Sequence, residues 1–375
     1  MQASQISSIR LTQILSLLIL IAAFVLSGSS RADDASAAAT DHVTVEQDDT
    51  APAVRPENPV NAEDEITLAI RQYQRGEYAK AADVFLKPEA QQTPAVNYYL
   101  GNLYALGRGL PQDDKKAHDH YVSAARSGHI PAMHSLGIVY ARGLGVKKSY
   151  LIAAEWYLEA VKQDYAPAMH NLGNLYAVGL GVRQDYEKAR ELYEAAAASG
   201  DTGSMCNLGN LYRYGYGVPM NFSTAKKWYE KGAEKNDECC LLNLAWFYFR
   251  GWGTPQDLKK ASELDKTGAL QGSPVAAFNL ARMYHYGMGT DEDAKAAWYW
   301  YNQSAAGNYA PAMEQIADIF EQGLLGQETN AEKAVEWKKM AKDAAREAAK
   351  QHDPFSAAAY GLEDNMPVLP SEDNS

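Results

Sequence analysis

Gly-x-Gly pairs and a few cysteines and histidines are the residues of this chain whose types and spacing could support chemistry. A Gly-x-Gly pair cradles a phosphate group where it follows a β-strand and opens a helix. Here six such pairs recur in one register, each after a helical pattern, so they indicate the ends of helices. The sequence has no G-x-S-x-G, Walker loop, H-E-x-x-H or paired C-x-x-C motif. We therefore expect no catalytic residues, no metal and no cofactor.

The cysteines are Cys206, Cys239 and Cys240, too few and too clustered for a disulfide framework or a zinc site. Cys240 stands where the positions 36 residues away have Ala or Ser, which predicts a small buried residue. A bridge from Cys206 to Cys239 or Cys240 needs Cα atoms within about 7 Å. The pairing stays open, and unpaired structural thiols are the simpler interpretation.

His134 and His170 stand at equivalent positions, 36 residues apart. Neutral histidine is a common metal ligand, so a metal pair is conceivable. The simpler interpretation is that both lie on an exposed helix face, where polar residues are tolerated.

The chain carries 47 acidic and 35 basic residues, a formal net charge of −12. This balance disfavours nucleic acid and anionic membrane surfaces, whose phosphates repel an acidic protein. The hydrophobic content of 46% is sufficient for a sizeable core, and 24 tyrosines predict that Tyr recurs in that core.

A repeat of 36 residues must position these side chains. Leu or Ile recurs at this spacing seven times, at Leu100, Leu136, Leu172, Leu208, Leu244, Leu280 and Ile316. A small residue follows each one directly, and an aromatic residue such as Tyr176 stands four positions later. This spacing puts Leu and the aromatic on one helix face, so we expect Tyr176 to be buried between two helices. Glycines then end the first helix, and an N-cap residue such as Asp185 begins a second one.

These residues closely resemble the Sel-one-like repeat (SLR), a relative of the tetratricopeptide repeat (TPR). The clearest matches are Ala168–Val182 (AMHNLGNLYAVGLGV) and Ser204–Val218 (SMCNLGNLYRYGYGV). The resemblance covers about residues 95–345, with Asp265 departing from the usual second-helix Tyr. It implies an all-α fold, a right-handed α/α superhelical solenoid of about seven 36-residue helix-turn-helix repeats.

The flanks of the repeats differ in composition. An apolar run from Leu11 to Leu26 is typical of a signal peptide, and we expect cleavage after Ala32; a retained anchor is the alternative, although about 20 apolar residues are needed to span a bilayer. The expected organisation is a signal peptide (1–32), a disordered acidic linker (33–62), a degenerate TPR-like capping unit (63–94), the solenoid (95–352) and a disordered tail (353–375). The expected location is periplasmic or secreted.

The TPR resemblance also implies that the first helix of each repeat lines a concave groove. The residues expected to face a partner there are Tyr99, Arg142, Asn171, Asn174, Asn207, Asn210, Arg213, Tyr214, Asn243, Trp246, Phe249, Arg250, Asn279, Arg282 and Tyr286. Asn side chains can bracket a peptide backbone, Arg can bind a carboxylate in a fork, and aromatic residues anchor interfaces. Alternatively, Asn171, Asn207, Asn243 and Asn279 belong to the repeat consensus and bond to a neighbouring helix or loop.

The sequence therefore predicts an exported interaction scaffold or adaptor that binds a protein or peptide partner along its groove. An acidic or C-terminal peptide segment suits the arginines. The alternatives are a peptidoglycan or polysaccharide binding module, because Tyr and Trp can stack on sugars, and an adaptor of the endoplasmic reticulum lumen if the host is eukaryotic. No nucleic-acid partner and no membrane span after signal cleavage are expected.

Overall fold

The computed structural model describes residues 62–351, and in this range all regular structure is helical. The expected signal peptide, linker and tail lie outside the described residues, apart from Ala62. The first helices are α2 (Ala62–Gln74) and α3 (Tyr78–Phe85), followed by a short 3₁₀ helix, Ala90–Gln92. Both helices fall in the segment where a capping unit was expected.

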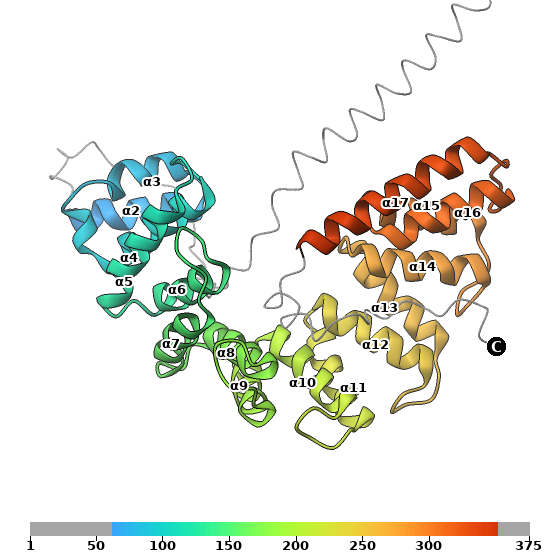
Figure 1. Cartoon of the computed structure of the whole chain (residues 1–375), viewed down its shortest axis with the longest axis horizontal. Helices are drawn as coiled ribbons and strands as arrows, with labels where there is room; N and C mark the ends of the chain where they lie inside the picture. Colours follow the sequence, from blue (N-terminus) through green and yellow to red (C-terminus); the bar gives the residue numbers. More distant parts are fainter. Residues whose placement is uncertain (1–61, 352–375) are drawn as a thin grey trace, which may run out of the picture. The chain divides into compact units, whose positions relative to one another are not determined.

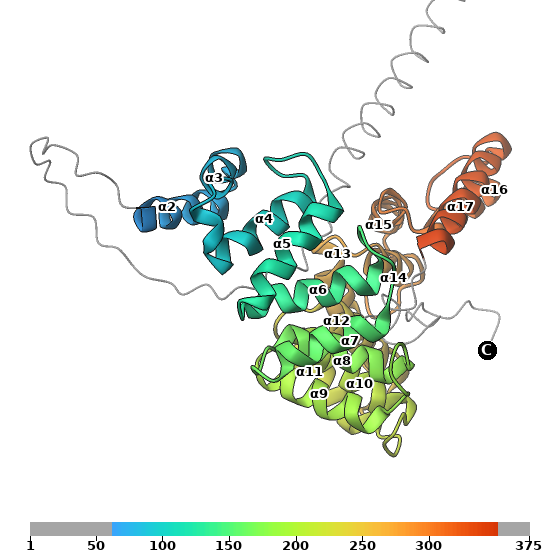
Figure 2. The ribbon, with the colours of Figure 1, turned by 60° about the vertical axis from the view of Figure 1, so that its left-hand side comes forward.

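Seven helix pairs follow, and we call the first helix of each pair helix A and the second helix B. The pairs are α4 (Pro94–Leu106) and α5 (Asp114–Arg126), α6 (Ile130–Arg142) and α7 (Tyr150–Val161), α8 (Ala166–Val178) and α9 (Tyr186–Ala198), α10 (Thr202–Tyr214) and α11 (Phe222–Ala233), α12 (Glu238–Arg250) and α13 (Leu258–Leu270), α14 (Pro274–Tyr286) and α15 (Ala294–Ala306), and α16 (Ala310–Gln322) and α17 (Ala331–Gln351). Each helix packs against the next one along the chain, as Figures 1 and 2 show. These are the repeats 1 to 7 of a solenoid, so the predicted fold class is confirmed.

The helices of each repeat begin and end at the capping residues that the sequence predicts. In repeat 3, Gly179 ends α8 with a left-handed φ of 82°, and the Asp185 carboxylate accepts a hydrogen bond from the backbone N–H of Lys188 at 3.1 Å to begin α9. The second glycine of the loop, Gly181, lies against the backbone of Tyr150 and Leu151 at the start of α7. A Cβ atom at this position would overlap that backbone, so the loop can dock on the previous repeat only with glycine there.

The core lies between helix A and helix B, and its largest members are the helix-B tyrosines. Tyr193 is 1% exposed, and a Cβ atom added to Gly173 of helix A would stand only 2.6 Å from its ring. Its hydroxyl donates to Asn174 Oδ1 at 2.7 Å. The same Tyr-to-Asn hydrogen bond joins Tyr121 to Asn102 and Tyr229 to Asn210. In repeats 1 to 4, the glycine that follows the Leu of helix A is therefore the position on which a tyrosine ring packs.

The helix-A aromatic of repeat 3 is less buried than the sequence suggested, whereas Tyr104, Tyr248 and Phe320 are buried. Tyr176, expected to be buried, is only partly so, and Lys188 Nζ lies 5.3 Å from the centre of its ring. The ring stands at the C-terminal end of α8, where the loop leaves one side open. Among residues 62–351, no helix is long and apolar enough to cross a membrane.

A candidate interaction surface on the helix-A side

The predicted asparagines form a buried ladder between repeats. Five of them are at most 5% exposed, namely Asn174, Asn207, Asn210, Asn243 and Asn279, whereas Asn171 is half-buried. Asn207 Nδ2 of α10 donates to Asn174 Oδ1 of α8 at 2.9 Å, and Asn171 Nδ2 lies 2.9 Å from His134 Nε2 of α6. Asn279 Nδ2 donates to Asp265 Oδ1 at 3.3 Å. The sequence left this role open for Asn171, Asn207, Asn243 and Asn279 as the alternative to binding, and these bonds support it. Asn174 and Asn210 were expected to face a partner but are buried.

The ladder also contains His134 and His170. The prediction that both histidines lie on an exposed helix face is wrong. His134 is 7% exposed, and its burial lowers its pKa to about 4, so it is a neutral part of the contact between α6 and α8. His170 Nδ1 lies 3.0 Å from Asp201 Oδ1 and 3.0 Å from Ser204 Oγ. Burial by itself would raise the pKa of Asp201, but hydrogen bonds and charge from His170 outweigh it and lower this pKa to about 2. Both histidines therefore join adjacent repeats.

A disulfide bond fastens two helices A together. Cys206 of α10 is bonded to Cys239 of α12, with Cα atoms 6.1 Å apart, so the simpler interpretation of unpaired thiols is wrong for this pair. Asp237 lies beside the two sulfurs, but sulfurs bonded to each other are not thiolate ligands for a metal. Cys240 is a buried free cysteine, which confirms its predicted role as a small core residue.

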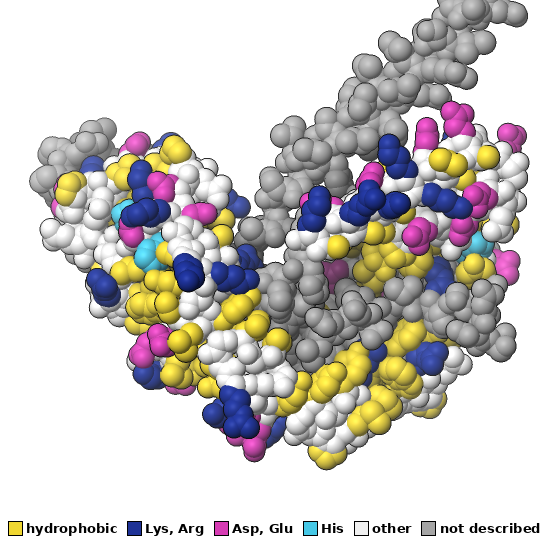
Figure 3. All heavy atoms as spheres, viewed as in Figure 1, with side chains coloured by type: hydrophobic (Ala, Val, Ile, Leu, Met, Phe, Trp, Pro, Cys, Tyr) yellow, Lys and Arg dark blue, Asp and Glu magenta, His cyan; other side chains and the backbone are white. Residues whose placement is uncertain are grey.

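The structure brings five of the predicted partner-binding residues together with one that sequence reasoning missed. We call this group the arginine–aromatic cluster: Arg213, Tyr214, Trp246, Phe249, Arg250 and Trp252. It is built from the C-terminal ends of α10 and α12 and from the loop after α12. On the face seen in Figure 3, hydrophobic side chains gather over this part of the chain. The missed residue, Trp252, fills the middle of a Gly-x-Gly pair where repeats 2 and 3 have Leu, and this departure was its only signal in the sequence.

Both guanidinium groups of the cluster face aromatic rings. The Arg213 Cζ atom lies 4.8 Å from the centre of the Tyr214 ring and 5.3 Å from Trp252. The Arg250 Cζ atom lies 5.6 Å from the Trp246 ring, and Trp246 stacks on Phe249 at 5.6 Å with an interplanar angle of 13°. A surface of aromatic rings and guanidinium groups suits a partner that has both apolar and anionic groups, because the rings contact the apolar groups and the guanidinium groups attract the anionic ones.

The remaining predicted residues lie on other repeats. Arg142 is exposed at the end of α6, and Arg282 is buried with its Cζ atom 6.0 Å from the Phe278 ring. Tyr286 stacks on His285 at 4.2 Å, whereas Tyr99 is half-buried among the aromatic residues of α2, α3 and α4. Burial raises the pKa of Tyr99, so its hydroxyl stays neutral.

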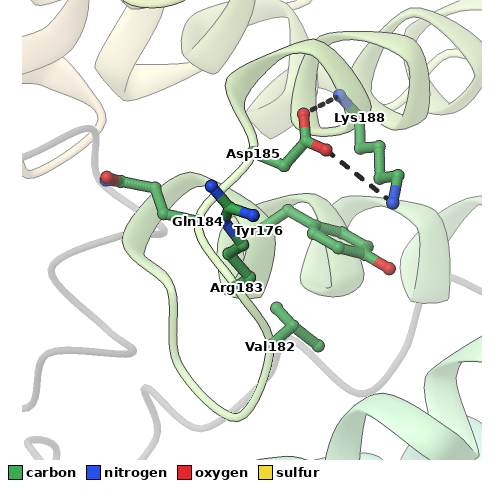
Figure 4. Close-up of a pocket in the computed structure, with 6 residues that line it drawn as sticks. All are labelled: Tyr176, Val182, Arg183, Gln184, Asp185 and Lys188. Carbon is green, nitrogen blue, oxygen red and sulfur yellow. Dashed lines mark hydrogen bonds and ion pairs between the residues drawn. The ribbon is translucent and has the colours of Figure 1, made fainter.

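A shallow pocket in repeat 3 is a separate feature (Figure 4). It is lined by Tyr176, Val182, Arg183, Gln184, Asp185 and Lys188. The Lys188 ammonium group lies 3.7 Å from Asp185 and over the Tyr176 ring. This cation is already engaged by a carboxylate, so the arginine–aromatic cluster offers the stronger attraction to an anionic group.

Comparison with known proteins agrees with this architecture. A family model described as the Sel1 repeat matches residues 94–129, 130–165, 166–201, 202–237, 240–272, 274–309 and 310–344. A crystal structure of a protective antigen present in uropathogenic Escherichia coli strains, displaying an SLR fold, is similar with a TM-score of 0.61 and 30% identity, covering 80% of this chain and 67% of that one. A Sel1 repeat protein from Oxalobacter formigenes is similar with a TM-score of 0.53 and 30% identity, covering 74% of this chain and 96% of that one. No curated protein matches the chain.

Proposed function

Because the chain belongs to the Sel1 repeat family, a family of non-catalytic repeat scaffolds for protein–protein interactions, we propose that it is an exported adaptor that binds a protein partner along its helix-A side. The arginine–aromatic cluster is the observation that carries this proposal. Its Trp246 and Trp252 stand at positions where the other repeats have smaller residues, and its Arg213 stands where repeats 1 to 3 have Ala. The repeat fold does not require these side chains, and clustered Arg and Trp are the residues that dominate binding at interfaces.

Export is supported by two independent features. The first is the apolar run near the N-terminus, typical of a signal peptide cleaved after Ala32. The second is the disulfide between Cys206 and Cys239, because such bonds persist in oxidising compartments and are rare in the cytosol. We propose a periplasmic or secreted location, and mass spectrometry of the exported protein should find Asp33 as the first residue. An exported protein that retains Met1 would contradict cleavage.

One observation favours a second candidate function, binding of a cell-envelope glycan. The parallel rings of Trp246 and Phe249 form a half-buried stack of the kind on which sugar rings pack. The two guanidinium groups beside the stack favour the protein partner, because a neutral sugar leaves them without a counter-charge.

Affinity purification from an envelope extract, with bound proteins quantified, tests the proposed function. We expect Arg250→Ala together with Trp246→Ala to reduce retention of the specific partner at least about tenfold, which corresponds to about 1.4 kcal/mol. Lys227→Ala is the matched control, because it removes an exposed cation from helix B of repeat 4. If the control reduces retention and the cluster variants do not, helix B is the binding surface instead.

A further inference from the structure

The two arginines of the arginine–aromatic cluster lie against aromatic rings. Several other basic side chains of this acidic protein pair with carboxylates instead, as Arg190 does with Glu194 at 2.8 Å and Lys226 with Glu230 at 2.6 Å. Within residues 62–351, neither Arg213 nor Arg250 forms an ion pair. Both guanidinium groups face aromatic rings, whose attraction for a cation is weaker than that of a carboxylate.

Arg213 in addition holds a buried donor that is not used. Its side chain is 7% exposed, and its Nη1 donates to Asn243 Oδ1 at 2.6 Å, which fixes the guanidinium plane. Its Nε is buried and has no hydrogen-bond partner among the described residues. A buried donor without an acceptor is unfavourable, so an acceptor atom that reaches it when the neighbouring side chains move aside would be bound favourably. Arg250, by contrast, is exposed and can approach a ligand from solvent.

The rings between the arginines form an apolar wall. Trp246 stacks on Phe249 and meets Trp252 edge-on at 6.3 Å, and Trp252 stacks in turn on Phe222 at 5.0 Å. These contacts hold the rings in place before any ligand arrives, which reduces the ordering cost of binding. A large apolar side chain can pack on this wall while a neighbouring anionic group reaches the guanidinium groups.

We propose that the arginine–aromatic cluster binds an extended acidic peptide segment in which a carboxylate lies next to a large apolar side chain. This inference rests on the proposed scaffold function and names its ligand class. The carboxylate accepts hydrogen bonds from the paired N–H groups of Arg250 and from the unpaired Nε–H of Arg213, and the apolar side chain packs on Trp246 and Phe249. The carboxylate thereby supplies the counter-charge that residues 62–351 do not provide.

The test uses the whole exported protein and a synthetic peptide of about 12 residues, long enough to span roughly 40 Å when extended. The peptide alternates Asp or Glu with Phe or Leu, and two comparison peptides replace either the acids by Lys or the apolar residues by Ala. Isothermal titration calorimetry should detect binding of the first peptide only. Its affinity should fall as salt rises, because exposed charges are screened within about 10 Å at 0.1 M.

Substitutions then locate the site. We expect Arg250→Ala to weaken peptide binding about tenfold and Arg250→Lys to restore only part of it, because Lys keeps the charge but not the planar fork. Trp246→Ala should weaken binding similarly, and Lys227→Ala should leave it unchanged. Arg250 is exposed at the end of α12, so its variants should melt at the wild-type temperature, and Arg250→Glu provides a second variant in which repulsion should abolish binding.

The outcomes separate this inference from the function on which it rests. Equal peptide affinity in wild type and Arg250→Glu would overturn the site, and binding of an envelope oligosaccharide in place of the acidic peptide would overturn the ligand class. If no peptide binds while partner retention still falls in the cluster variants, the ligand class is wrong and the scaffold function stands. If partner retention is also unchanged in those variants, both proposals fail.

Discussion

Repeats 4 and 5 are built on the same 36-residue unit but differ in the residues that join helix A to helix B. In repeat 4, the Tyr229 ring lies on Gly209, and its hydroxyl donates to Asn210 Oδ1 at 2.7 Å. In repeat 5, Ala245 stands in place of the glycine, Trp246 in place of the asparagine and Asp265 in place of the tyrosine. Both partners of the Tyr-to-Asn hydrogen bond have thus changed together.

The difference teaches where this fold can accommodate a binding site. Trp246 replaces the asparagine that accepts this hydrogen bond in repeat 4. Its ring stacks on Phe249, and Arg250 lies over it. Asp265 is 2% exposed, and this burial raises its pKa to about 8, although the hydrogen bond that it accepts from Asn279 acts in the opposite direction. The disulfide joins this altered repeat to the regular repeat 4. Repeat 4 keeps the Tyr-to-Asn hydrogen bond and supplies Arg213 and Tyr214 to the cluster, whereas repeat 5 lacks that bond and supplies Trp246, Phe249, Arg250 and Trp252.

The largest expected effect is on the regular repeat. Tyr229→Ala removes a fully buried ring and should lower the free energy of unfolding by about 4 kcal/mol, as aromatic truncations in cores do. Urea denaturation followed by circular dichroism measures this loss. A loss below about 1 kcal/mol would mean that repeat 4 does not depend on its tyrosine and would remove the contrast with repeat 5.

Removal of the disulfide should have the next largest effect. The bridged residues are 33 positions apart, and a loop of this size predicts a loss of about 3–4 kcal/mol when Cys206 and Cys239 are both replaced by Ser. Thermal unfolding of the two proteins gives the difference. A reductant should lower the melting temperature of the wild type and leave the double variant unchanged; an equal response of both would show that the bridge does not link the repeats.

Asp265 should make the stability of the protein depend on pH. Its pKa is raised in the folded protein to about 8 from an unfolded value of about 3.9, so its stabilising effect is complete below about pH 4 and is lost as the pH rises towards 8. We expect Asp265→Asn to stabilise the protein at pH 8 by on the order of 2 kcal/mol and to flatten the fall in melting temperature between pH 5 and about 8. Parallel pH profiles of wild type and variant would contradict a buried neutral carboxyl group.

The smallest expected effect completes the comparison. Trp246→Ala in repeat 5 should cost only about 1 kcal/mol of stability, because Trp246 is half-buried and packs against rings that stay in place. Urea denaturation alongside Tyr229→Ala provides the matched measurement. If both variants lose the same stability, Trp246 is a core residue and the cluster is not specialised for binding.

The sequence was sufficient for the repeat architecture, because the period and the caps are local features. It overestimated how far helix A is open to a partner. Asn174, Asn207 and Arg213 have polar side chains at the expected positions, yet neighbouring repeats bury them. Such burial depends on contacts between residues about 30 or more positions apart, such as Arg213 with Asn243. The spacing of residues within one helix does not show which side chains a neighbouring repeat will bury.

The disulfide between Cys206 and Cys239 and the position of Trp252 could not be predicted from the repeat pattern either. Cys206 stands two residues before its repeat's Leu208, whereas Cys239 stands five before Leu244, so their pairing crosses the register of the repeat. Trp252 lies in a loop, where periodicity of a helix face says nothing about side-chain direction. Both features depend on how α10 and α12 pack against each other, which the sequence pattern does not give.

The docking of each loop glycine on the preceding repeat has a consequence for how such a chain can change over evolution. Gly181 lies on the backbone of Tyr150 and Leu151, and Gly253 lies in the same way on Phe222 and Ser223. The loop part of the joint between repeats is thus made by main-chain atoms, which every sequence has in common. A whole unit can be duplicated, deleted or exchanged without redesigning the joint, and Leu180 or Trp252 can occupy the neighbouring position with the joint intact. New recognition surfaces can therefore arise one module at a time.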